Sequence, residues 1–230
     1  MPDITIQTGD GDFSAYLAVP AGGSGPGIIA IQEIFGVNAD MRAHCDNFAA
    51  QGFVALSPDL FWRQEPGVQI TDQTEAEWQQ AFKLYQGFDV EKGVDDLIAS
   101  LAHLRGLDAC TGKAGTVGFC LGGLLAYLMA CRSDAQCNIS YYGVGIDERI
   151  DEASNITAPM ILHIAEEDEY VDKDAQTRLA DGLAGHSLVT MHSYAGVNHA
   201  FTRNNGIHYD EAAANLAHGR TTDAFAAALR

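Results

Sequence analysis

The chain has 230 residues, of which 47% are apolar and 19% charged, and these fractions exclude a disordered chain or a fibre. It carries 31 acidic and 13 basic side chains, so its formal net charge is −18, which argues against nucleic acid or an anionic membrane surface as a partner. The same field repels small anionic substrates, so a substrate of that kind needs a cation at its site.

The five cysteines are an odd number without C-x-x-C spacing, and we therefore expect neither a disulfide framework nor a structural zinc site. Residues 1–13 contain no basic region followed by an apolar one, so we expect no secretory signal. The densest apolar run, at residues 27–31, is far too short to span a bilayer. These features predict a reduced, soluble protein of the cytoplasm.

The predicted elements begin with an antiparallel hairpin, because residues 4–7 and 13–19 alternate apolar and polar side chains around a Gly-Asp-Gly turn. Residues 28–31 form a short continuous apolar run, typical of a buried strand. Strands and helices then follow one another. Helices are predicted at 38–51, 74–85, 90–105, 121–131, 173–183 and 210–229, and strands at 53–57, 113–119, 139–142, 160–165 and 188–194.

An antiparallel start followed by strand–helix repeats predicts an α/β fold with one doubly wound, mainly parallel sheet and helices on both of its faces. Residues 61–71 have no clear period, and we expect them to pass over the carboxyl ends of the strands. No repeat or change in composition divides the chain, which predicts a single domain over residues 1–230.

The most specific motif is TVGFCLGG at residues 116–123, which matches G-x-nucleophile-x-G with Cys120 at the position where hydrolases often carry serine. The backbone of such a turn is strained, so Gly118 and Gly122 have to lack side chains. The following helix directs its free N–H groups and positive dipole end at the cysteine, which favours a thiolate. A buried structural cysteine is the alternative, but strand, glycines and helix together favour a nucleophile.

A nucleophile in this turn needs a base and a group that orients the base, and both are expected later in the chain in the order acid, then histidine. Four acidic residues, 166–169, follow one predicted strand, and His199 follows the next. An acidic loop is more often solvated surface, and a lone histidine is more often structural. Their positions after consecutive strands favour catalysis by His199, while spacing alone leaves the acid open around Asp168.

A further carboxylate, Glu33, lies in the loop after the first predicted parallel strand, beside Ile34, Phe35 and Gly36. In this architecture the same loop contributes an N–H group to an oxyanion hole. The apolar neighbours of Glu33 favour a place in the site over a solvated surface.

Several segments, taken in order, resemble the dienelactone hydrolase family (carboxymethylenebutenolidases). They are EIFGVN at 33–38, SPDL at 57–60, GVDDL at 93–97, CLGG at 120–123, YYGVG at 141–145 and HAF at 199–201. The resemblance implies an α/β-hydrolase fold and a triad of Cys120, Asp168 and His199. Asp168 is the implied acid because the family's aspartate stands three residues before a hydrophobic position, here Val171.

The resemblance also implies the remaining site residues. The oxyanion donors are the backbone N–H groups of Ile34 and Leu121, and Glu33 corresponds to the carboxylate that neighbours the thiol and helps govern its protonation. Arg203, four residues after the histidine, matches one of the family's carboxylate-binding arginines. The aromatic residues expected to line the pocket are Phe35, Trp78, Phe82, Tyr85 and Tyr142.

The chain departs from the family at Trp78, because better-known members carry a second substrate-binding arginine at the aligned position. Family substrates are small enol-lactones with a carboxylate, which are opened to maleylacetate in chloroaromatic breakdown. Loss of one cation makes another lactone or ester, more aromatic in character, a plausible substrate.

The expected protein is a cysteine hydrolase that opens a small enol-lactone through an acyl-thioester, without cofactor or metal. The alternatives are a carboxylesterase or lactonase for a neutral or aromatic ester, and a catalytically silent ligand-binding α/β-hydrolase. Redox chemistry lacks a second cysteine near Cys120, and metal catalysis lacks the ligand spacing. A small lactone or ester is the expected partner, with no nucleic acid and no membrane, and we expect a monomer, with a dimer as the alternative.

Overall fold

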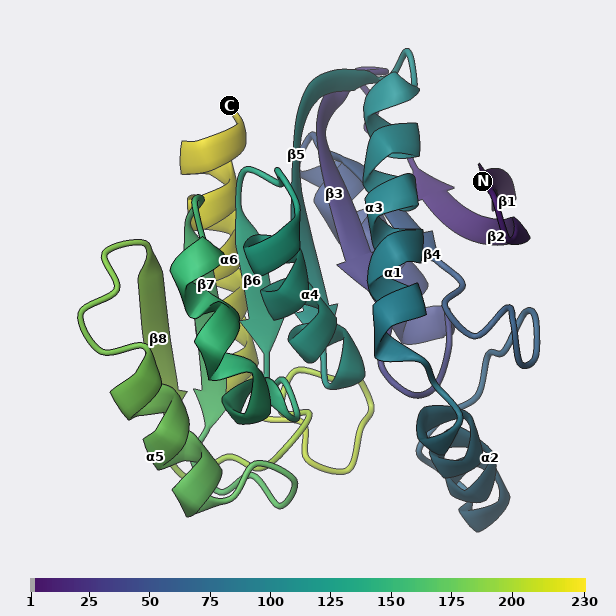
Figure 1. Cartoon of the computed structure of the whole chain (residues 1–230). Helices are drawn as coiled ribbons and strands as arrows, with labels where there is room; N and C mark the ends of the chain where they lie inside the picture. Colours follow the sequence, from purple (N-terminus) through teal and green to yellow (C-terminus); the bar gives the residue numbers. More distant parts are fainter. Residues whose placement is uncertain (1–2) are drawn as a thin grey trace. The chain divides into compact units, whose positions relative to one another are not determined.

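Strands and helices alternate along most of the chain (Figure 1). The computed structural model describes residues 3–230, within which there are eight strands and six α-helices. The chain groups into two units, the first ending at Thr116 and the second beginning at Val117, both within strand β5 (Cys110–Phe119). The single domain expected from the sequence stays a prediction.

The first unit begins with the antiparallel hairpin, which is confirmed. β1 (Asp3–Thr8) pairs with β2 (Gly11–Ala18), and β2 pairs antiparallel with β4 (Val54–Pro58). β4 then pairs in parallel with β3 (Gly25–Ile31), and the first part of β5 follows β3 in the sheet order. β4 and most of β3 are buried, as continuous apolar runs in a sheet covered on both faces should be.

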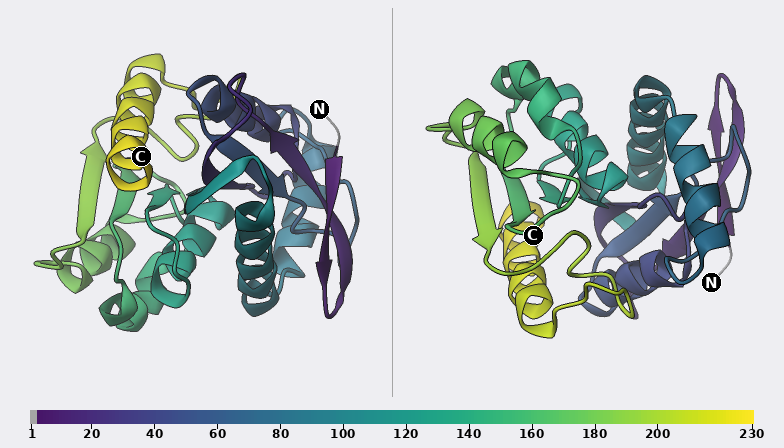
Figure 2. Two further views of the ribbon diagram at one scale, coloured as in Figure 1. Left: turned by 90° about the horizontal axis from the view of Figure 1, so that it is seen from above. Right: turned by 90° about the horizontal axis from the view of Figure 1, so that it is seen from below.

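Three helices accompany these strands, α1 (Ala39–Ala50), α2 (Glu75–Gln86) and α3 (Val90–Gly106). α1 and α3 lie on opposite faces of the strands (Figure 2), which is the doubly wound arrangement. Each helix begins where a side-chain oxygen accepts hydrogen bonds from N–H groups of the first turn. The residues that cap them are Asn38, Thr74 and Asp89.

The irregular segment 61–71 lies against the loop that leaves the carboxyl end of β3, as expected. The N–H group of Ile70 donates to the carbonyl of Phe35 at 3.1 Å, and the side-chain amide of Asn38 donates to the carbonyl of Ile70 at 2.9 Å. At the start of the segment, the N–H group of Leu60 donates to the side-chain oxygen of Gln32 at 3.0 Å. These bonds join two segments that the sequence keeps about 30 residues apart.

The second unit continues the sheet from the end of β5 through β6 (Asn138–Tyr141), β7 (Met160–Ala165) and β8 (Val189–Tyr194). β6 pairs in parallel with β7, and β7 in parallel with β8. The mainly parallel sheet and the antiparallel start expected from the sequence are therefore confirmed. A 3₁₀ segment at Ile146–Asn155, kinked at Arg149, was not expected from the sequence.

α6 (Glu211–Leu229) covers one face of the strands of this unit, and α4 (Leu121–Arg132) and α5 (Lys173–Gly182) cover the other (Figure 2). Asp172 and Asp210 cap α5 and α6 through their carboxylates, whereas α4 begins without any side-chain cap. Over residues 3–230, no helix combines the length and the apolar character needed to cross a bilayer.

The turn from β5 into α4 is sterically tight. A Cβ atom on Gly118 would overlap the backbone carbonyl of Gly122, and one on Gly123 would lie 2.6 Å from the carbonyl oxygen of Tyr141. Backbone atoms cannot give way as the end of a flexible side chain can. The requirement for glycine at position 118 is therefore confirmed.

We expect Gly118→Ala to reduce the free energy of unfolding by about 3 kcal/mol, because the added methyl group overlaps backbone atoms. Gly219→Ala is the matched control, since Gly219 lies within α6 with no atom within 4 Å of the added Cβ. It should stabilise the protein by up to about 1 kcal/mol through helix propensity and raise Tm by about 2–4 °C. Thermal unfolding of both variants checks this, and a wild-type Tm for Gly118→Ala would contradict it.

Candidate active site

Cys120 occupies a strained turn between β5 and α4. Its φ of 56° and ψ of −115° place a non-glycine residue in a region that side chains rarely adopt. Its N–H group donates to the carbonyl of Tyr141 at 3.1 Å, and its carbonyl accepts from the N–H group of Gly123 at 2.9 Å. The buried thiol therefore stands at the uncapped N-terminus of α4, where the helix dipole favours a negative charge.

Asp168 is the member of the acidic run 166–169 that bonds His199. The Nδ1 atom of the imidazole lies 3.0 and 2.9 Å from the two carboxylate oxygens of Asp168, and both side chains are buried. One carboxylate oxygen also accepts from the N–H groups of Tyr170 and Val171, at 2.9 and 3.1 Å. An ionised carboxylate only accepts hydrogen bonds, so Nδ1 carries a proton and the free electron pair of neutral His199 lies on Nε2.

The Nε2 atom of His199 is buried, and no oxygen or nitrogen atom within residues 3–230 forms a hydrogen bond with it. Burial by itself lowers the pKa of His199, but the charge of the Cys120 thiolate and the hydrogen bond to Asp168 outweigh burial and raise this pKa to about 10. The surroundings of His199 therefore favour its protonated, imidazolium form.

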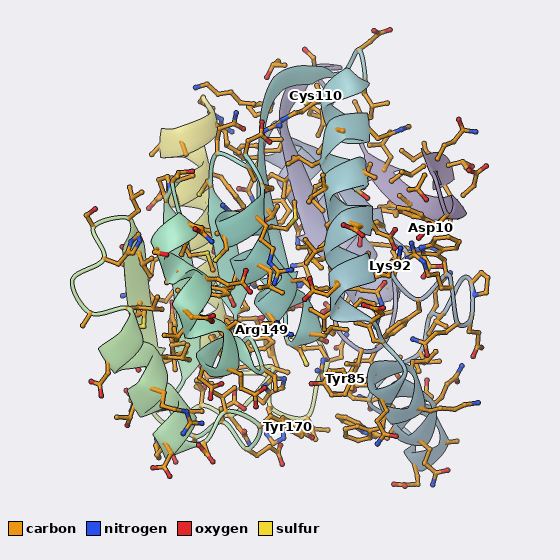
Figure 3. All side chains as sticks on the ribbon, viewed as in Figure 1. Asp10, Tyr85, Lys92, Cys110, Arg149 and Tyr170 are labelled. Carbon is orange, nitrogen blue, oxygen red and sulfur yellow. The ribbon has the colours of Figure 1, made fainter. Side chains whose placement is uncertain are left out.

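Two tyrosine rings contact the imidazole edge to face. The ring centroids of Tyr142 and Tyr170 each lie 4.9 Å from that of His199, at interplanar angles of 62° and 77°. Tyr142 is 2% exposed, and its hydroxyl lies 2.8 Å from that of Thr202. Tyr170 is 43% exposed and lies at the carboxyl end of β7 (Figure 3). Sequence reasoning missed Tyr170, although an aromatic residue two positions after the expected acid was a usable signal.

Arg203 lies in the loop after His199 and is buried. Its N–H group donates to the carbonyl of Ala200 at 3.0 Å, and Ala200 itself has a φ of 61°. Burial raises the pKa of Tyr170, as do the charges of Glu169 and Cys120, whereas the charge of Arg203 lowers it. The charges of Arg203 and Cys120 thus act on the same exposed phenol.

Glu33 and Ile34 lie in the loop after β3, one residue beyond its end, and both are buried. They are the thiol neighbour and the oxyanion donor that are expected from the first unit. Leu121, the other expected oxyanion donor, is the first residue of α4 in the second unit. Over residues 3–230, no three His, Cys, Asp or Glu side chains are grouped so that they could hold a metal ion.

Trp78 packs within an aromatic cluster of the first unit. Its ring stacks on Phe82 with centroids 5.4 Å apart and meets Phe35 edge to face at 5.1 Å. Its indole N–H donates to the carbonyl of Asp72 at 3.0 Å. Phe82 and Tyr85 are partly exposed on α2 (Figure 3 labels Tyr85). The position at which family members carry an arginine is therefore a half-buried aromatic one here.

Solved structures with similar folds support the architecture. One from Klebsiella pneumoniae has a TM-score of 0.87 at 24% identity and covers 98% of this chain and 97% of that chain. A dienelactone hydrolase from Anabaena variabilis has a TM-score of 0.71 at 18% identity and covers 100% of this chain and 98% of its own. At these identities the likeness concerns the fold, and the expected α/β-hydrolase fold is confirmed.

Relatives in sequence are closer. A protein of Azospirillum brasilense is 51% identical over 229 residues, which are 98% of each chain. The carboxymethylenebutenolidase of Pseudomonas putida is 38% identical over 221 residues, covering 96% of this chain and 94% of its own. The model of the dienelactone hydrolase family matches residues 13–229. The chain therefore belongs to the dienelactone hydrolase family and is a hydrolase of lactones or esters.

Proposed function

We propose that this hydrolase opens a small enol-lactone through a cysteine nucleophile, Cys120, and an acyl-thioester intermediate. The observation that carries the proposal is the buried bond from His199 Nδ1 to Asp168, because it orients Nε2 as the proton carrier for the thiol. The left-handed conformation of Cys120 at the start of α4 supports the same role. The charge of Cys120 raises the pKa of His199. A histidine with a purely structural role would not require a strained cysteine beside it.

In the proposed reaction the Cys120 sulfur attacks the lactone carbonyl and forms a C–S bond, while the carbonyl electron pair moves onto oxygen. The backbone N–H groups of Leu121 and Ile34, which the family resemblance implies as donors, stabilise that oxyanion. When the carbonyl re-forms, the ring C–O bond breaks and the leaving oxygen takes the proton from His199. Water, deprotonated by His199, then attacks the thioester, and the Cys120 thiolate leaves.

An anionic enol-lactone is the proposed substrate class. The Pseudomonas putida relative is named a carboxymethylenebutenolidase, and Arg203 supplies a cation against a formal net charge of −18. A neutral or aromatic ester is the second candidate, favoured by the packing of Trp78 against Phe35 and Phe82. We further propose a monomeric protein of the cytoplasm that takes part in aromatic breakdown. The unpaired cysteines fit a reducing compartment.

Cys120→Ala and His199→Ala should each lower kcat/KM by about 10³-fold or more, because triad members act as a unit. Iodoacetamide should label Cys120 first, since it reacts with thiolates. Burial raises the pKa of Cys45, of Cys131 to about 11 and of Cys137 to about 12, so these thiols should react slowly. Mass spectrometry identifies the labelled cysteine at each time point, and the activity of the same samples shows whether labelling and inactivation coincide. Loss of activity with label mainly on Cys45 or Cys131 would identify a different thiol.

The raised pKa of His199 determines the direction of the pH dependence. Because it lies at about 10, the imidazolium stays protonated through the neutral range and loses its proton only as the pH rises through that value. The Cys120 thiolate keeps its cationic partner below that pH. We propose that Glu33, which corresponds to the family's carboxylate beside the thiol, opposes this charge pair with its own negative charge.

Glu33→Gln should therefore accelerate alkylation of Cys120 between pH 6 and 8 and change its pH profile, because a charge that disfavours the thiolate is removed. Asp46→Asn is a suitable control, since the carboxylate of Asp46 bonds the Tyr16 hydroxyl at an exposed position. Alkylation reactions that are quenched at set times, at each pH, measure the rate at which Cys120 reacts. Identical profiles for Glu33→Gln and wild type would leave Glu33 with a structural role only.

Arg203→Met should raise KM for an anionic lactone by about 10- to 150-fold, the equivalent of about 1.5–3 kcal/mol for a partly desolvated guanidinium–carboxylate pair. A neutral aryl ester should be hardly affected. Trp78→Arg should then improve kcat/KM for the anionic lactone selectively, with a lower Tm from the lost stacking on Phe82. Equal losses on both substrates in Arg203→Met would show that Arg203 supports the His199 loop instead.

A further inference from the structure

We propose that Tyr142 is a positioning residue for the triad, whose peptide group holds the nucleophile turn against β7 and whose side chain holds the turn that carries His199. The inference rests on the proposed cysteine-hydrolase function. The contact of Tyr142 with substrate stays a prediction. Its hydroxyl lies 2.8 Å from that of Thr202.

The backbone of Tyr142 connects two of the three triad segments. The carbonyl of Tyr141 accepts from the N–H group of Cys120 at 3.1 Å, and the N–H group of Tyr142 donates to the carbonyl of His163 at 2.9 Å. Both atoms belong to one planar peptide group. This group therefore fixes the Cys120 turn relative to β7, and Asp168 follows the end of β7 by three residues.

Tyr142 adopts this position at a cost in backbone energy. Its φ of 38° is left-handed, which is uncommon for an aromatic residue and persists only where surrounding contacts over-determine it. The contacts are present, because the ring of Tyr142 also meets that of Phe201 edge to face at 5.6 Å and lies 6.3 Å from that of Phe119. The strained residue thus lies directly after β6, between the strands that lead to the nucleophile and to the acid.

The side chain of Tyr142 reaches the third triad segment. Its hydroxyl bonds the hydroxyl of Thr202, which is fully buried and lies three residues after His199. The intervening Ala200 has a left-handed φ of 61°, and its carbonyl accepts from the N–H group of Arg203 at 3.0 Å. The histidine turn is therefore held at its far end by a residue that also contacts the nucleophile turn.

The ring of Tyr142 restricts the remaining freedom of the imidazole. Asp168 holds only the Nδ1 edge of His199, so the direction of Nε2 depends on what packs against the ring. Tyr142 and Tyr170 both pack there, but Tyr170 is 43% exposed and Tyr142 is 2% exposed. The buried ring of Tyr142 therefore restricts rotation of the imidazole and keeps Nε2 directed toward Cys120.

Tyr142→Phe tests this role, because it removes the bond to Thr202 and keeps the ring. We expect kcat to fall about 5- to 20-fold with KM unchanged within about twofold, and the rate of Cys120 alkylation at pH 7 to fall in parallel. Thr202→Val removes the same bond from the other side and should give the same result, while Thr202→Ser should restore wild-type values. The double variant should be no slower than either single variant, since only one bond is lost.

Tyr194→Phe is the matched control. Its buried hydroxyl bonds His163 at 2.7 Å and Arg220 at 3.1 Å, so its loss also lowers Tm but touches no triad residue. We expect its kcat and alkylation rate to match wild type.

The positioning role is overturned if Tyr142→Phe and Thr202→Val keep wild-type kcat and alkylation rates, or if Tyr194→Phe slows both equally. Activity that survives Cys120→Ala would overturn the proposed function itself, whatever the Tyr142 variants do. The two failures are therefore distinguishable.

Discussion

The buried hydrogen bond between Asp168 and the Nδ1 atom of His199 is the interaction on which the rest of the site depends. Burial alone would keep the imidazole neutral, and a neutral imidazole has no fixed tautomer. The carboxylate selects the tautomer and, together with the thiolate, raises the pKa of His199. Two backbone N–H groups, from Tyr170 and Val171, hold the carboxylate in turn. The buried Asp168 carboxylate is therefore hydrogen-bonded on both sides, by the imidazole and by the backbone.

The turn that carries Cys120, the nucleophile of the proposed function, has a second distinctive feature, the missing side-chain cap of α4. Side chains cap the other five α-helices in residues 3–230, whereas α4 starts after Cys120 without one. The first N–H groups of α4 are therefore not occupied by a side-chain cap. The strain at Cys120 is tolerated because Gly118 and Gly123 let the backbone segments approach closely. Backbone strain and an uncapped helix N-terminus thus coincide at Cys120, the nucleophile of the proposed function.

Trp78 is the position at which this chain departs from the arginine that the family resemblance implies, and in the proposed function this bears on substrate charge. Trp78 stands at the position of an arginine and is held by stacking on Phe82 and by its bond to Asp72. An aromatic residue offers area and shape but little attraction for a carboxylate, and a formal net charge of −18 disfavours anions further. Selectivity between a charged lactone and an aromatic ester is therefore decided mainly by Arg203 and Trp78 in the proposed function.

The sequence by itself predicted the strands, the six helices and the positions of Cys120 and His199, because apolar periodicity and glycine sterics are local properties. The choice of Asp168 within 166–169 needed the family resemblance, since four adjacent acids differ only in what they meet in space. Only the tertiary structure revealed the 3₁₀ helix at Ile146–Asn155, the contact of Tyr170 with His199 and the bond from Tyr142 to Thr202. Tyr142 and Thr202 are 60 residues apart, and no local pattern records which distant side chains a folded sheet brings together.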